Sequence, residues 1–162
     1  MKTLHLLRHA KSDWEDGALP DHERPLAPRG VKAARRLTEH LEKDPLQLDL
    51  VLCSTAKRTR ETLQLILPAL GRVDVSFEDD LYGAGAGELQ ARLRRLSRRV
   101  GAVLVIGHNP GLEELASLLL GPAAPGHFPT LALASMRFPV AEWRSIREGS
   151  AEPIAFVTPK AI

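Results

Sequence analysis

Three stretches of the chain share one order of residue types: a short apolar run, then polar or cationic residues, then apolar residues at helical spacing. They are TLHLLRHA at residues 3–10, LDLVLCSTAKRTRETLQLIL at 48–67 and AVLVIGHNPGLEELASLLL at 102–120. Near-continuous apolar strands that alternate with helices are typical of a parallel sheet covered on both faces. The pattern therefore predicts an α/β fold, a three-layer α/β/α sandwich with a mostly parallel central sheet.

Two more helices are predicted between these units. Their apolar residues recur at the spacing of one helix face: Val31, Ala34, Leu37 and Leu41 in the first, and Leu89, Leu93, Leu96 and Val100 in the second. Short β-like runs at residues 72–77, 131–138 and 153–159 predict further strands, and the proline-rich stretch 121–129 predicts a loop. Because no repeat or linker interrupts the pattern, residues 1–162 are expected to form one domain.

The overall composition is that of an ordinary globular protein, with 44% hydrophobic residues, 26% charged residues and a net charge of +2. This balance of charge gives no reason to expect nucleic-acid binding. The first apolar run is interrupted by Arg8, His9 and Lys11 too soon for a signal peptide or a membrane span. The single cysteine, Cys53, forms no internal disulfide and fits a reducing compartment. We therefore expect a cytoplasmic protein without nucleic-acid or membrane partners.

Cations and histidines stand where the three predicted parallel strands end. Arg8 and His9 follow the first strand, Arg58 follows the second, and His108 and Asn109 follow the third. Ligands of parallel α/β sheets bind at the carboxyl ends of the strands. Arginine offers permanently charged forks to phosphate oxygens, and a neutral imidazole can attack phosphorus. Each residue alone would be an ordinary strand-edge residue, but their joint occurrence predicts phosphoryl transfer through histidine.

The turn GHNPGLEE is suited to hold the third of these strand ends in place. Asn109 can cap a helix, Pro110 suits the first helical position, and Glu113 and Glu114 lie favourably in the first turn. His108 would then be held by rigid backbone on both sides. An ordinary strand-to-helix turn with an incidental histidine is the alternative.

Four ordered motifs carry a resemblance to a known family. LLRHAKS, RPLAPRG, STAKRTRET and VIGHNPGLE resemble the histidine phosphatase superfamily, and specifically its short SixA-like branch of phosphohistidine phosphatases. The resemblance spans roughly residues 4 to 120. It implies a phosphoglycerate mutase-like fold in which His9 is the nucleophile that becomes phosphorylated. It also implies that Arg8, Arg58 and His108 form the rest of the phosphate pocket.

Three weaker candidates for substrate binding are Ser12, Arg24 and Asn109. A hydroxyl near the phosphate and an arginine in the RPL turn would fit, although Ser12 and Arg24 could equally cap or brace loops. The connection from Ser12 to Pro28 is long for a compact domain, and such loops are commonly lids or binding loops. We expect it to border the site.

The segment around Arg58 contains two features that we expect to lie outside the chemistry. Arg58 matches the arginine of the family's S-x-x-x-R segment, whereas Arg60, two residues on along a helix, should point elsewhere. Cys53 precedes Arg58 by four intervening residues, one fewer than the cysteine-phosphatase signature needs. We expect Cys53 to be a buried strand-end residue.

Two positions depart from the family's pattern. The family usually has glycine after the nucleophile, whereas Ala10 follows His9 here, so the turn must accommodate a Cβ atom. The family's general acid is usually a glutamate, and Gly83 stands at its place. Imidazole leaving from phosphohistidine depends less on such an acid than an alkoxide does, so this absence favours a phosphohistidine substrate. Three acidic residues nearby could still replace this general acid: Glu78, Asp79 and Asp80. We expect them instead to lie in a turn exposed to solvent.

The sequence thus predicts a metal-independent phosphatase with a phosphohistidine enzyme intermediate, acting on protein phosphohistidine. One alternative is a phosphomonoesterase for small metabolites or nucleotides, with Glu78 or Asp80 as the acid. Another is a noncatalytic phosphoprotein-binding module. No cofactor and no metal are expected, since the other histidines show no metal-ligand spacing with cysteines or carboxylates. The expected partner is a phosphate-bearing substrate such as a histidine-phosphorylated protein.

Two remaining features have ordinary explanations. The glycine-rich run from Gly83 to Glu88 fits neither nucleotide-binding glycine pattern and predicts a flexible connection. Five arginines between Arg92 and Arg99 give the second predicted helix a basic face, for which we expect contact with solvent. The alternative for this face is a docking surface for an acidic protein partner.

Overall fold

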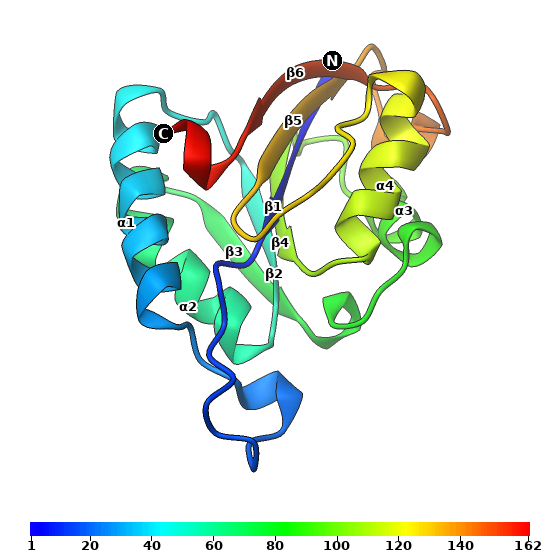
Figure 1. Cartoon of the computed structure of the whole chain (residues 1–162). Coiled ribbons are helices and arrows are strands. Elements are labelled where there is room, and N and C mark those ends of the chain that lie inside the picture. Colours follow the sequence, from blue (N-terminus) through cyan, green and yellow to red (C-terminus); the bar gives the residue numbers. More distant parts are fainter.

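The computed structural model describes residues 1–162 as a six-stranded sheet with helices on both faces (Figure 1). The strands are β1 (Lys2–Arg8), β2 (Leu50–Ser54), β3 (Asp74–Glu78), β4 (Ala102–Gly107), β5 (Leu133–Phe138) and β6 (Glu152–Val157). The α-helices are α1 (Pro28–Lys43), α2 (Lys57–Ile66), α3 (Ala86–Arg94) and α4 (Gly111–Leu120). None of the helices is both long and apolar enough to cross a membrane. The predicted three-layer α/β/α sandwich is confirmed.

The order of the strands brings the predicted strand ends together. The sheet runs β3-β2-β4-β1-β5-β6, with β1 to β4 parallel and β5 and β6 antiparallel to their neighbours. β4 lies between β2 and β1, so that Ile106 stands opposite Cys53 and Gly107 stands opposite Arg8. The carboxyl ends of these three strands are therefore side by side at one edge of the sheet.

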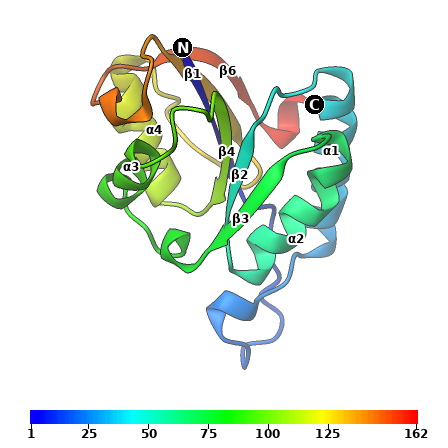
Figure 2. The same ribbon diagram turned by 180° about the vertical axis from the view of Figure 1, so that it is seen from behind.

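The two faces of the sheet carry separate apolar cores. Leu104 and Ile106 of β4 pack in a cluster with residues of α1 and α2, whereas Val103 and Val105 pack in a cluster with residues of α3 and α4. Figure 2, which shows the molecule from behind, displays the two helix pairs on either side of the sheet. All of β4 is buried. Burial on both faces is why its sequence is a continuous apolar run rather than an alternating one.

The long connection after β1 extends beyond the carboxyl edge of the sheet, at the bottom of Figure 1. It contains the short 3₁₀ helix η1 (Asp21–Glu23). Its two ends are joined by an isolated antiparallel bridge between Ser12 and Leu26. The Asp13 amide also donates to the Pro25 carbonyl at 2.8 Å. These two contacts close the base of the loop and hold the loop next to the strand ends, as expected for a loop that borders a site.

The second predicted helix is shorter than its apolar spacing indicated. α3 ends at Arg94, and Leu96 and Val100 lie in tight turns beyond it. The Val100 amide donates to the Ser97 carbonyl, and the Ser97 hydroxyl accepts from the amide of Arg99, so local bonds replace helical ones. Both apolar side chains still pack against the core on this face. The prediction was correct about burial and wrong about the helix end.

The predicted basic face is exposed at four of its five arginines, Arg94, Arg95, Arg98 and Arg99, and three of the five have a partner within the protein. Arg92 donates to the Glu78 carboxylate at 2.7 Å, and Arg94 donates to the Arg144 carbonyl at 3.0 Å. Arg98 lies beyond the helix, 3.8 Å from Glu142. The face is therefore in contact with solvent, as predicted, and a docking surface stays the alternative.

The turn after β4 differs from its prediction by one residue. α4 begins at Gly111, with Pro110 directly before it rather than in its first position. The Asn109 side-chain oxygen accepts from the Glu113 amide at 3.2 Å, so Asn109 caps the helix as predicted. Glu113 and Glu114 occupy the first turn. Helix boundaries commonly shift by one or two residues in this way.

Candidate active site

A pocket of about 260 Å³ opens at the carboxyl ends of β1, β2 and β4. No aspartate or glutamate lines it. The lining side chains come from these strand ends, from the loop after β1 and from the segment before β5: Arg8, His9, Lys11, Ser12, Trp14, Arg58, His108, Asn109 and Thr130. Four of them are the arginines and histidines that the sequence predicted would converge. The pocket is therefore cationic and contains two imidazoles.

His9 is held in one tautomer by the backbone. Its Nδ1 atom lies 2.6 Å from the carbonyl oxygen of Ala10. Because a carbonyl oxygen only accepts, Nδ1 must carry the proton in this contact. In the neutral ring the lone pair then lies on Nε2. This arrangement leaves Nε2 free to act as a nucleophile.

Burial keeps the His9 ring neutral. Only 6% of the residue is exposed, and this desolvation lowers its pKa to about 4, with smaller contributions from the charges of Arg58 and Arg8. At neutral pH the imidazole is therefore unprotonated at Nε2.

The backbone at the end of β1 is clamped from both sides. The His9 amide donates to the Gly107 carbonyl at 3.1 Å, and the Leu131 amide donates to the carbonyls of Arg8 and His9. Leu131 is the only residue other than glycine with a positive φ, at 61°. A bulky residue in this left-handed conformation is strained, and such strain is commonly found at functional sites. Through its two hydrogen bonds, Leu131 holds the backbone of Arg8 and His9 in place.

The Cβ atom of Ala10, which the family's usual glycine lacks, is accommodated without strain. Ala10 is fully buried in the core formed with α1 and α2. Its amide donates to the Thr62 hydroxyl at 3.0 Å, and its φ is not positive. The turn therefore does not require glycine.

His108 faces His9 across the pocket, with 5.4 Å between the ring centroids. Its Nε2 atom lies 2.8 Å from the Ser54 hydroxyl oxygen, while its Nδ1 atom is buried without a partner. Burial, followed by the neighbouring His9 and Arg58, lowers its pKa to about 3. A buried polar nitrogen without a partner is uncommon, and it marks this ring as a candidate for a functional role.

The two arginines are fixed by acceptors outside the pocket. Arg8 donates from Nη1 to the Phe128 carbonyl at 3.0 Å, and its buried Nε has no partner. Arg58 donates from Nη1 to the Asp21 carbonyl at 2.8 Å and from Nη2 to the Asp21 carboxylate at 3.0 Å. Together with His108 these side chains present several polar nitrogen atoms, and Arg8 Nε and His108 Nδ1 have no partner. Such a set suits a tetrahedral oxyanion.

The comparisons with known proteins agree with this geometry. Residues 4–101 match the family model described as histidine phosphatase superfamily (branch 1). The chain belongs to the histidine phosphatase superfamily. An uncharacterized protein of Mycobacterium tuberculosis, Rv1276c, is 34% identical over 165 residues, which cover 95% of this chain and all of the relative.

Solved structures place this histidine phosphatase in the SixA-like branch. A protein from Nakamurella multipartitia described as a SixA phosphohistidine phosphatase superimposes with a TM-score of 0.84 and 30% identity, over 98% of this chain and 96% of the other. The protein histidine phosphatase SixA complexed with tungstate gives a TM-score of 0.79 and 25% identity, over 98% and 97% of the two chains. The predicted family, branch and phosphoglycerate mutase-like fold are confirmed, and the chain is a phosphatase-type hydrolase.

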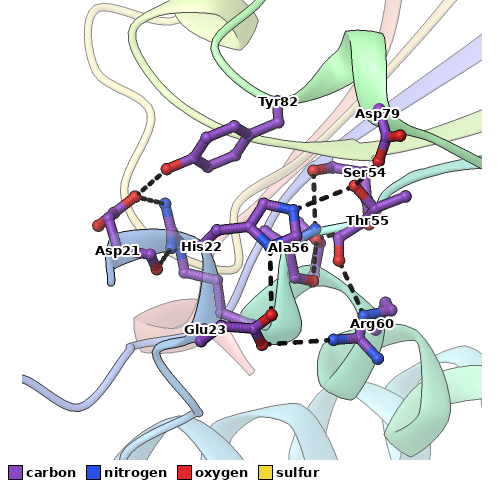
Figure 3. A network of polar contacts seen from close by, with 11 residues as sticks. Asp21, His22, Glu23, Ser54, Thr55, Ala56, Arg60, Asp79 and Tyr82 are labelled. Atoms are coloured by element: carbon purple, nitrogen blue, oxygen red, sulfur yellow. Dashed lines mark hydrogen bonds and ion pairs between the residues drawn. The ribbon is translucent and has the colours of Figure 1, made fainter. Parts of the chain in front are cut away.

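One part of this phosphatase site had no signal in the sequence. Asp21 of η1 receives hydrogen bonds from Arg58 and from the Tyr82 hydroxyl, the latter at 2.5 Å (Figure 3). The hydrogen bond from Tyr82, together with Arg58, lowers the pKa of Asp21. His22 extends the network to the Thr55 hydroxyl at 3.1 Å. The sequence indicated only that the loop would border the site, because no fixed spacing links a loop residue to Tyr82.

The weaker predicted candidates lie in different places. Ser12 is buried and lines the pocket, and Asn109 lines it too while donating to the Phe128 carbonyl at 2.9 Å. Arg24 does not line the pocket: its guanidinium stacks on the Trp14 ring at 4.0 Å, so it braces the loop. The substrate-binding roles of Ser12, Arg24 and Asn109 stay predictions.

Arg60 and Cys53 lie outside the chemistry, as predicted. Arg60 is exposed and donates from Nε to the Thr55 carbonyl at 2.8 Å (Figure 3), and it does not line the pocket. Cys53 is completely buried, and burial raises the pKa of its thiol to about 12. The thiol is therefore not a nucleophile at neutral pH.

The acidic run does not reach the pocket. Glu78 is paired with Arg92, Asp79 accepts from the Thr55 hydroxyl at 2.6 Å, and Asp80 lines a separate depression beside α3. None of the three lines the pocket that contains His9. A phosphomonoesterase that uses Glu78 or Asp80 as its acid is therefore not favoured.

Proposed function

We propose that the protein is a metal-independent phosphohistidine phosphatase that forms a phosphorylated intermediate on His9. The observation that carries the proposal is the state of the His9 ring, which donates from Nδ1 to the Ala10 carbonyl and is kept neutral by burial. A neutral imidazole with a free Nε2, beside two guanidinium groups, is suited to attack a phosphoryl group.

The reaction has two steps. In the first, Nε2 of His9 attacks phosphorus in line, the P–N bond to the substrate histidine breaks, and the departing imidazole takes a proton from solvent. In the second, water attacks the phosphorus of phosphorylated His9 and gives up a proton to solvent, the P–Nε2 bond breaks so that Nε2 regains its lone pair, and inorganic phosphate leaves. Arg8, Arg58 and His108 stabilise the equatorial oxygens in both steps.

The surroundings of the pocket favour phosphohistidine over a phosphate ester. An alkoxide leaving group needs a positioned acid, which typically contributes ~10²–10⁴-fold. No carboxyl group lines the pocket, and the nearby Asp21 is kept ionised by its hydrogen bonds from Tyr82 and Arg58. A phosphohistidine substrate avoids this difficulty because its leaving imidazole is itself basic. The SixA protein complexed with tungstate, a tetrahedral oxyanion, supports the assignment of the pocket to a phosphoryl group.

The donor set also supports metal independence. The positive charges of Arg8 and Arg58 would repel a divalent cation from this pocket, and they supply the charge that a metal would otherwise provide. Hydrolysis should therefore proceed at the same rate with EDTA present.

The test is a comparison of substrates on the wild type and on His9→Ala. The wild type should release phosphate from a phosphohistidine peptide faster than from small alkyl phosphates, and His9→Ala should lose about 10³-fold or more of that rate. Rapid quenching of the wild type should trap an acid-labile phosphoenzyme. Full activity of His9→Ala, or strong turnover of alkyl phosphates without turnover of phosphohistidine, would overturn the proposal.

A further inference from the structure

A cavity of about 500 Å³ lies beside the catalytic pocket. It is bounded by α1, by the segment before β5 and by the C-terminal 3₁₀ helix η6 (Pro159–Ala161). Figures 1 and 2 both show the C-terminal segment against α1. Lys11 and Thr130 line both this cavity and the catalytic pocket. The two cavities therefore adjoin each other at these residues.

This cavity, called the basic cavity below, carries an unbalanced positive charge. Five cationic residues line it and no aspartate or glutamate does: Lys11, Arg29, Lys32, Arg36 and Lys160. None of the five has a carboxylate within 4.0 Å. In contrast, Arg58 and Arg92 both have carboxylate partners. Five unpaired like charges around one cavity repel each other and raise the affinity for an anion.

Three of these cations form a row along α1. Arg29, Lys32 and Arg36 are spaced three and four residues apart, so they lie on one face of the helix over roughly 10 Å. The first turn of α1 is docked on the nucleophile's loop, since a Cβ atom at Gly30 would lie 2.2 Å from the Lys11 carbonyl oxygen. The row of cations therefore begins next to the catalytic pocket and leads away from it.

The exposure of these cations indicates the kind of ligand. Sites for small molecules hold a few fixed, buried polar groups that set the orientation of the ligand. Here all five cations are exposed on flexible side chains, which suits an acidic chain segment whose carboxylates can pair in more than one way. We infer that the basic cavity binds an acidic segment of the histidine-phosphorylated protein while the phosphohistidine occupies the pocket of His9. This inference rests on the proposed function.

Two peptides that differ only in charge test the inference. Each carries one phosphohistidine, flanked within about six residues either by glutamates or by glutamines, a length that can span the row of cations. Arg36→Glu and Lys32→Glu should each lower kcat/KM for the acidic peptide about tenfold and change it less than twofold for the neutral one. The difference should shrink as salt is raised.

Arg35→Glu is the matched control. Arg35 is exposed on the same helix but does not line the cavity, so its charge reversal should leave both peptides unaffected. Equal losses for Arg35→Glu and Arg36→Glu, or equal losses for the two peptides, would overturn the inference. Hydrolysis of the neutral peptide by the wild type and not by His9→Ala tests the proposed function separately.

A binding measurement keeps the inference testable even without turnover. The unphosphorylated acidic peptide, labelled with a fluorophore, should bind the His9→Ala protein, and adding Arg36→Glu should weaken that binding. The inference is wrong if the peptide does not bind but inorganic tripolyphosphate does, and if Lys32→Glu abolishes the binding of tripolyphosphate. The cavity would then bind a small polyanion.

Discussion

The Nε2 atom of His108 lies 2.8 Å from the hydroxyl oxygen of Ser54, and this contact joins the carboxyl ends of the neighbouring strands β4 and β2. Ser54 is fully buried, and its hydroxyl oxygen also lies 3.3 Å from the Ala56 amide before α2. The serine therefore fixes the orientation of the His108 ring, and with it the side of the ring that faces the phosphate. Groups that orient a functional imidazole in this way often matter nearly as much as the imidazole itself.

Replacing this serine should reduce activity. In Ser54→Ala the His108 ring loses its one hydrogen bond, and kcat/KM for a phosphohistidine peptide should fall about tenfold, the value of one hydrogen bond in the transition state. Ser135→Ala is a matched control because Ser135 makes the same kind of buried contact, at 2.7 Å, with His5 away from the pocket. It should affect stability but not kcat/KM. Equal losses of activity in the two variants would show that Ser54 has no specific role.

The carboxylate of Asp21 should weaken phosphate binding while it holds Arg58. It forms a salt bridge with the guanidinium of Arg58, which we assign to phosphate binding, and it carries a negative charge of its own. Asp21→Asn keeps an acceptor for Arg58 and removes that charge, so inorganic phosphate should bind about threefold to tenfold more tightly. Calorimetric titration measures this effect, with Asp16→Asn in the same loop as the control. Weaker binding in Asp21→Asn would mean that the charge is needed to orient Arg58.

The sequence predicted the parts of the site that follow from strand order. Because parallel strands end at one edge, Arg8, His9 and His108 could be placed together without coordinates. Asp21 and Tyr82 could not, since they meet only through the path of the loop after β1 and the turn after β3. The same reason explains the basic cavity, which depends on how the C-terminal segment returns to α1. Local periodicity likewise indicated that Leu96 would be buried but not that α3 would end before it.

Gly30 should be indispensable for docking α1 on the loop after β1. An added methyl group would lie 2.2 Å from the Lys11 carbonyl oxygen, which is backbone and cannot turn aside. Gly30→Ala should therefore destabilise the protein by roughly 2–4 kcal/mol and displace the loop. Gly87→Ala in α3 meets nothing within 4 Å and should be neutral or stabilising by up to about 1 kcal/mol. Urea unfolding measures the free energy of unfolding of both variants. If the two were equally stable, the close approach of Gly30 to the Lys11 carbonyl would be contradicted.

Acid should destabilise the protein through its buried histidines. Burial lowers the pKa of His9 to about 4, whereas the unfolded chain has its ordinary value of 6.5. Between these values the unfolded state binds more protons, so the free energy of unfolding falls as the pH falls from about 6.5 towards 4. At pH 5 the loss relative to pH 7 from this one group is on the order of 1–2 kcal/mol.

Urea unfolding at pH 7 and pH 5 checks this prediction by comparing variants. His9→Asn should lose less stability between the two pH values than the wild type does, since it lacks one titrating imidazole. His5→Asn should show a similar reduction, because burial also lowers the pKa of His5 to about 4. The two variants differ in catalysis, since His5 bonds to Ser135 away from the pocket and its loss should leave phosphohistidine hydrolysis intact. If the pH dependence of stability were the same in wild type and His9→Asn, His9 would not be the neutral, buried group that the mechanism requires.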